Sequence, residues 1–130
     1  MNEIYFDHDK LKVYQKAIEF VAWVNRIIKG IKIRTSTIDQ LGRAADLIAL
    51  NIAEGNGKYT GKDKCRYFDI SRGSAFESAS CLDLLFSKNL ITSENVKEGK
   101  EQLREIVSML MGLIKSNSNR VYENEDNYSY

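Results

Sequence analysis

The chain has 130 residues, of which 43% are apolar and 28% are charged, as in a single globular domain with enough material for a sizeable core. It contains no proline, although about six are usual at this length. Because β-sandwiches, barrels and extended linkers place proline at turns and edges, its absence disfavours those classes. The net charge of +1 (19 Lys and Arg, 18 Asp and Glu) neither supports nor excludes nucleic-acid binding.

Features of export and membrane insertion are missing from the sequence. Cys65 and Cys81 form neither a disulfide framework nor the spacing of zinc ligands. The acidic first ten residues do not resemble a secretory signal, and no apolar run approaches the roughly 18 to 20 residues of a membrane span. We therefore expect a cytoplasmic protein that does not enter a membrane.

Four segments have apolar residues at the three- and four-residue spacing of an amphipathic helix. They cover about residues 9–29, 37–54, 60–89 and 93–115. Asp7 is placed to cap the first helix and Ser36 the second, and Thr60 precedes Asp63 by the three residues of a capping box.

The connections between these helices are short, and no segment shows the alternation of a β-strand. Short connections between long helices make sequence neighbours antiparallel. We therefore predict an all-α fold, an up-down-up-down antiparallel four-helix bundle over residues 1–116. The polar, acidic segment 117–130 is predicted to be a disordered or loosely docked tail.

The first helix has more apolar residues than one core face needs. Phe20, Trp23 and Ile27 form a second stripe, displaced from the main apolar face. If the stripe faces solvent, it is a costly exposed patch, and it predicts an interface with a second copy of the chain. In the alternative interpretation, the fourth helix or the tail covers Trp23.

The residues of common catalytic and metal sites are scarce. His8 is the only histidine, and the glycine-rich segment 55–63 lacks the spacing of a phosphate-binding loop. We therefore predict no catalytic residue, no cofactor and no metal. Glu54 and Glu77 occur among small and apolar residues, and with Arg72 they favour a buried structural network over an acid/base pair or a di-metal site.

Basic residues gather at one end of the predicted bundle. This end contains the start of the first helix, the turn between the second and third helices, and the end of the fourth helix. Tyr59 and Tyr67 are interleaved with them, whereas Asp7 and Asp63 are among nearby acids that compensate the charge. Such a cluster is either a solvated face or a site for RNA or DNA phosphates. Its members are Lys10, Lys12, Lys16, Lys58, Lys62, Lys64, Arg66, Lys115 and Arg120.

Three blocks of sequence resemble a known family. They are Gln40-Leu-Gly-Arg-Ala-Ala45, Asn51-Ile-Ala-Glu-Gly55, and Tyr67-Phe-Asp-Ile-Ser-Arg-Gly-Ser74 with Glu77. From Leu11 to about Leu113 the chain is similar to the four-helix-bundle proteins encoded in intervening sequences of bacterial 23S ribosomal RNA genes. The resemblance implies a cytoplasmic bundle without known catalytic activity. It gives a motif role, structural in character, to Asn51, Glu54, Gly55, Arg72, Gly73, Ser74 and Glu77.

The same resemblance extends to accessory proteins of diversity-generating retroelements, which form pentameric rings and bind nucleic acid and a reverse transcriptase. It therefore implies a homo-oligomer, a pentamer, with these partners. The chain departs from the family pattern in two places. Ala49-Leu50 stands where a proline is common, and Lys58 stands where an arginine is common, which removes a bidentate phosphate fork.

Two hypotheses of function follow. The leading one is a non-enzymatic oligomeric bundle that binds RNA or DNA through the basic end. The alternative is a scaffold that binds a protein partner through the Phe20–Trp23–Ile27 stripe or the acidic tail, without nucleic acid. An enzymatic function is a third hypothesis, placed after these two.

Overall fold

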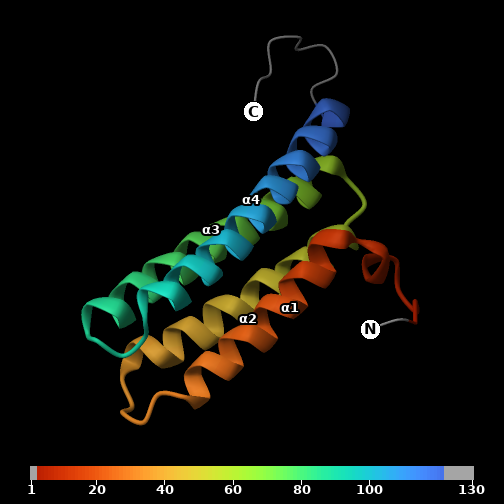
Figure 1. Cartoon of the computed structure of the whole chain (residues 1–130). Helices are drawn as coiled ribbons and strands as arrows, with labels where there is room; N and C mark the ends of the chain where they lie inside the picture. Colours follow the sequence, from red (N-terminus) through yellow and green to blue (C-terminus); the bar gives the residue numbers. More distant parts are fainter. Residues whose placement is uncertain (1–2, 122–130) are drawn as a thin grey trace.

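The computed structural model describes residues 3–121, with side chains described as far as Ser118. This part of the chain has one short 3-10 helix, four α-helices and no strand (Figure 1). The elements are η1 (Asp7–Lys10), α1 (Lys12–Lys29), α2 (Ser36–Asn56), α3 (Gly61–Ser87) and α4 (Ser93–Val121). Each helix packs antiparallel to its sequence neighbour and α1 closes against α4. The predicted all-α, up-down-up-down bundle is confirmed.

Helix boundaries differ from the predicted ones in informative places. The Thr60 hydroxyl accepts a hydrogen bond from the Asp63 backbone N–H at 3.1 Å, as predicted for the start of α3. The predicted caps Asp7 and Ser36 are wrong. Asp7 lies in η1 and accepts a hydrogen bond from the Asn56 side chain at 3.0 Å, and Ser36 is already the first residue of α2.

The last helix is longer than predicted. It continues to Val121, so the expected domain boundary after residue 116 falls inside α4. Asn117 and Ser118 are buried, and the Asn117 side chain donates to the Leu113 carbonyl at 2.8 Å. The remainder of the predicted tail, residues 122–130, lies outside the described residues.

The predicted exposed stripe of α1 belongs to the core. Phe20 is 0% exposed and Trp23 is 8% exposed, and Ile27 packs half-buried against the same core. A Cβ at Gly99 would lie 2.7 Å from Cη2 of Trp23, because α4 passes directly over the indole. The prediction that Phe20, Trp23 and Ile27 form an oligomer surface is therefore wrong, and the alternative in which α4 covers Trp23 is confirmed.

Small residues allow α2 and α3 to pack closely. Ser71, Ser74 and Ser78 are buried on α3, and the Ser71 hydroxyl donates across the interface to the Ile48 carbonyl at 2.8 Å. On α2, a Cβ at Gly55 would lie 2.8 Å from the Cβ of Tyr67. The buried serines of α3 thus lie in closely packed surroundings, whereas a Cβ at Gly73 would face open space.

Candidate nucleic-acid interface

The structure brings the predicted basic segments together at one end of the bundle, which we call the proximal end. It consists of η1, the start of α1, the α2–α3 turn, the start of α3 and the end of α4 (Figure 1). The Asn56 side chain ties the end of α2 to Asp7 of η1. The Cys65 thiol lies 3.4 Å from the Ile114 carbonyl oxygen, which holds the first turns of α3 against α4.

Four of the predicted cations already have partners in the fold. Lys64 Nζ donates to the Asn56 carbonyl oxygen at 2.6 Å and so satisfies an acceptor at the end of α2. Lys58 Nζ lies 3.9 Å from the Glu54 carboxylate and 4.9 Å from the ring centroid of Tyr67. The other two are in ion pairs, Lys10 with Asp7 at 3.8 Å and Lys16 with Glu105 at 3.4 Å.

Lys62 and Arg66 remain available for an anion. Both are exposed and, within residues 3–118, neither forms an ion pair. Four residues apart on α3, they lie on the same helix face. Lys12 and Lys115 are also exposed, and neither forms an ion pair within residues 3–118. The Tyr59 ring is fully exposed in the α2–α3 turn at the same end of the bundle. The side chain of Arg120 lies outside the described residues.

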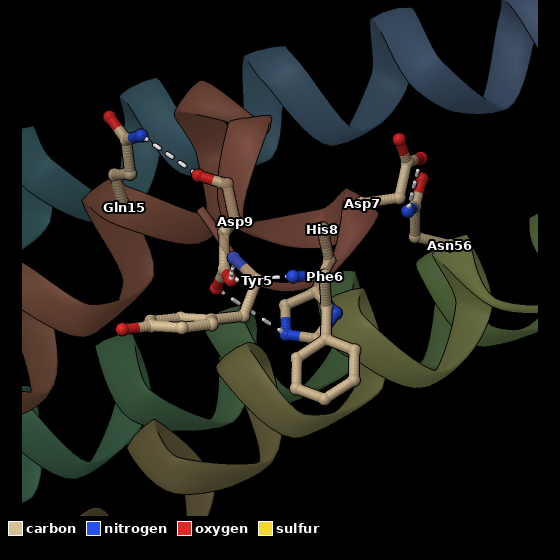
Figure 2. A network of polar contacts seen from close by, with 7 residues as sticks. All are labelled: Tyr5, Phe6, Asp7, His8, Asp9, Gln15 and Asn56. Atoms are coloured by element: carbon tan, nitrogen blue, oxygen red, sulfur yellow. Dashed lines mark hydrogen bonds and ion pairs between the residues drawn. The ribbon is translucent and has the colours of Figure 1, made fainter. Parts of the chain in front are cut away.

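A polar network fixes the N-terminal segment at this end (Figure 2). The Asp9 carboxylate accepts hydrogen bonds from the backbone N–H groups of Tyr5 and Phe6, each at 3.0 Å. These bonds favour the charged carboxylate and lower the pKa of Asp9 below its ordinary value. The Gln15 side chain donates to the Asp9 carbonyl at 3.0 Å, which anchors the segment to α1.

Comparison with known proteins gives the chain a family. A sequence profile described as 23S rRNA-intervening sequence protein matches residues 9–112, which is most of the bundle. The chain belongs to this family. The match includes Lys12, Lys62 and Arg66 and ends before Lys115.

A solved structure shares the fold of this family member. It is a protein with unknown function from the S23 ribosomal protein family of Bacteroides thetaiotaomicron. The two chains are 24% identical, with a TM-score of 0.75 over 79% of this chain and 98% of that chain. No curated protein matches the sequence.

The motif positions of this family member do not form the buried network that the sequence predicted. Glu54 and Glu77 are both exposed, and Arg72 pairs locally with Asp69 at 3.0 Å, so that prediction is wrong. Asn51 has a structural role, because its buried side chain donates to the Leu47 carbonyl at 2.8 Å. Across the described side chains, no three His, Cys, Asp or Glu residues form a cluster that could hold a metal ion.

Sequence reasoning missed a second group of cations at the opposite end, which we call the distal end. Arg26, Lys29, Lys32 and Arg34 lie at the end of α1 and in the α1–α2 connection, and all four are exposed. The signal was present in the sequence, because no Asp or Glu occurs between Phe20 and Ile38. In the described part of the chain, no helix is long and apolar enough to cross a membrane.

Proposed function

We propose that this protein is a non-enzymatic, cytoplasmic homo-oligomer that binds RNA or DNA through the phosphate backbone at its proximal end. The observation that carries the proposal is the pair Lys62 and Arg66, which is exposed and free of ion pairs on one face of α3. Lys12 and Lys115 enlarge the positive surface, and the exposed Tyr59 ring offers a stacking surface for a base.

Binding of this kind has a defined dependence on salt. Each phosphate neutralised by Lys or Arg releases a counterion, so the affinity falls steeply as salt rises. About four contacts predict a slope near −3.6 in a plot of log K against log salt for duplex DNA. The contacts recognise the backbone, so the affinity should depend little on base sequence.

Reversing the two free cations of α3 tests the proposal. We expect Lys62→Glu with Arg66→Glu to weaken the binding of a labelled duplex at least about tenfold at low salt and to reduce the salt slope by about 2. Fluorescence anisotropy measures both quantities. Arg43→Glu with Arg104→Glu is the matched control, because these exposed arginines lie in the middle of α2 and α4 and give the same change in charge. Equal weakening in both variants would contradict the proposal, as would no weakening in either.

The oligomer requires an apolar face other than the stripe of α1. Leu47 and Leu50 of α2 and Ile70 and Leu84 of α3 are large apolar side chains that remain exposed. We expect Leu50→Asp with Ile70→Asp to dissociate the oligomer, which the resemblance to the retroelement accessory proteins implies is a pentamer, while circular dichroism stays unchanged. Sedimentation velocity measures the assembly. A wild-type chain that sediments as a monomer at high micromolar concentration would contradict this part of the proposal.

The scaffold hypothesis is the second candidate, and the exposed segment Ile4-Tyr5-Phe6 favours it. This segment is held in place by Asp9 and offers apolar side chains to a protein partner, such as the reverse transcriptase that the resemblance implies. A pure scaffold would bind no duplex and would be indifferent to the Lys62 and Arg66 reversals.

A further inference from the structure

The positive charge of the distal end is less neutralised by acidic side chains than that of the proximal end. Of its four cations, only Arg34 is in an ion pair, with Asp39 at 3.0 Å. Arg26, Lys29 and Lys32 have no acidic partner within residues 3–118. We call Arg26, Lys29, Lys32 and Arg34 the distal patch.

The neighbouring elements do not neutralise the distal patch. Lys88, at the end of α3, donates to the Thr37 hydroxyl at 3.0 Å, which brings a further cation to the start of α2. At the start of α4, Glu94 is followed three residues later by Lys97, which offsets its charge. The helix dipoles cancel at this end, because α1 and α3 end there and α2 and α4 begin there, so the charged side chains set its potential.

The distal patch is too far from the proximal end to form one site with it. The 21 residues of α2 run from one end of the bundle to the other, a length of about 31 Å. This is about three Debye lengths at 0.1 M salt, so polyanions bound at the two ends would repel each other only weakly. Figure 1 shows the α1–α2 connection and the α2–α3 turn at opposite ends of the molecule.

We infer that the distal patch is a second nucleic-acid site, and that one copy of the chain bridges two nucleic-acid segments, one at each end of its bundle. This inference rests on the proposed function for its first site. The distal ligand is a phosphate backbone of any sequence, because the patch offers cations and no exposed aromatic side chain among residues 26–34 for stacking on a base.

A lipid surface is the competing source of negative charge. Ile33 is 63% exposed between two cations, which is a feature of segments that dock on anionic membranes. However, Ile31 packs against the core, so Ile33 is the only large apolar side chain of the connection that is free to insert. Charge therefore dominates the distal patch, and nucleic acid presents a denser line of negative charge, one for each 1.7 Å or so of duplex.

A bridging assay tests the inference with the full chain. A biotinylated duplex on beads captures the protein, and recovery of a second, fluorescent duplex measures bridging. We expect the wild-type chain and the Arg43→Glu, Arg104→Glu control to recover the second duplex. We expect Arg26→Glu with Lys32→Glu to reduce recovery to background, while its affinity for a single duplex falls by less than about twofold, because the proximal site binds more tightly and remains. Circular dichroism confirms that each variant folds.

Three results would overturn the inference. One is a wild-type chain that binds a duplex and does not bridge. Another is bridging that survives Arg26→Glu with Lys32→Glu, because several proximal ends of an oligomer would then account for it. The third is an Arg26→Glu, Lys32→Glu variant that still bridges two duplexes but no longer binds phosphatidylserine vesicles. That result would assign the distal patch to lipid. Failure of the proposed function looks different, because single-duplex binding would then be insensitive to Lys62→Glu with Arg66→Glu.

Discussion

Asp9 shows how one side chain sets the position of a segment. Its carboxylate holds the backbone N–H groups of Tyr5 and Phe6, and both of these side chains consequently remain exposed beside the start of α1. The arrangement satisfies backbone donors that precede η1 and would otherwise need water. It requires a charged carboxylate, because the protonated form is a weaker acceptor.

This requirement predicts a pH dependence of the N-terminal segment. The pKa of Asp9 is lower in the folded chain than in the unfolded chain, where its ordinary value is 3.8. The contribution of Asp9 is therefore fully present above the unfolded value and is lost as the pH falls through the folded value. We expect the amide resonances of Tyr5 and Phe6 to shift in that acid range in an NMR titration. In Asp9→Asn the same amides should be insensitive to acid, and a titration like that of the wild type would contradict the assignment.

For the candidate site, the sequence predicts where the charged side chains gather but not which of them have partners. The cluster of cations at one end follows from helix order alone, and the structure brings the described members together. Whether a cation is free depends on partners that the sequence does not specify. Lys64 binds the Asn56 carbonyl, whereas Lys62, two residues earlier, points to the other side of the same helix and has no partner among the described side chains.

At the scale of helices, two glycines of the family motifs have opposite surroundings. Gly55 lies against α3, where an added Cβ would meet the Cβ of Tyr67 at 2.8 Å. That atom is attached to the backbone of α3 and cannot swing aside. Gly73 has no atom within 4 Å of the position that a Cβ would occupy. Gly55 therefore serves helix packing, while Gly73 leaves α3 with the low helix propensity of glycine and no packing gain in the monomer.

Alanine at these two positions should change stability in opposite directions. We expect Gly55→Ala to lower the free energy of unfolding by about 1–3 kcal/mol, because α2 and α3 must separate slightly. We expect Gly73→Ala to raise it by up to about 1 kcal/mol, because alanine favours the helix. Urea denaturation followed by circular dichroism gives both values. A loss of stability in Gly73→Ala would mean that another copy of the chain contacts this position.

The periodicity of apolar residues predicted the four helices correctly. It did not predict which of their faces are buried by a neighbouring helix. The spacing of apolar residues locates a helix and its main face, but a bundle helix contacts two neighbours, and the second contact accounts for Phe20 and Trp23. Only the glycine at position 99, seventy-six residues after Trp23, makes room for the indole under α4. The end of α4 was missed for a related reason, since buried Asn117 is polar and bonds to its own helix.

For the whole molecule, the distribution of charge matters more than its sum. Residues 122–130 contain three acidic residues and no basic one, so their removal changes the net charge from +1 to +4. The described part of α4 ends at Val121, at the proximal end, and the three acidic residues follow within five positions of the sequence. We therefore expect their negative charge to oppose the approach of nucleic acid to the proposed phosphate site.

Truncation after Val121 should therefore strengthen binding. We expect an increase in duplex affinity of about three- to tenfold at low salt that disappears near 0.5 M salt, where the Debye length is only a few ångströms. Anisotropy titrations at several salt concentrations measure the effect. A chain in which Glu123, Glu125 and Asp126 are replaced by their amides is the control and should reproduce the gain. Unchanged affinity in both would show that the acidic segment does not act on the site.

The burial of Trp23 gives the protein an internal optical reporter. Trp23 is the only tryptophan of the chain, its ring centroid lies 5.7 Å from that of Phe20, and its far edge meets α4 at Gly99. The indole on α1 is thus shielded from water by a helix of the other hairpin. Intrinsic emission will therefore shift to longer wavelength when the α1–α2 and α3–α4 hairpins separate, even if every helix stays folded. Fluorescence compared with circular dichroism distinguishes opening of the bundle from melting of its helices without any added label.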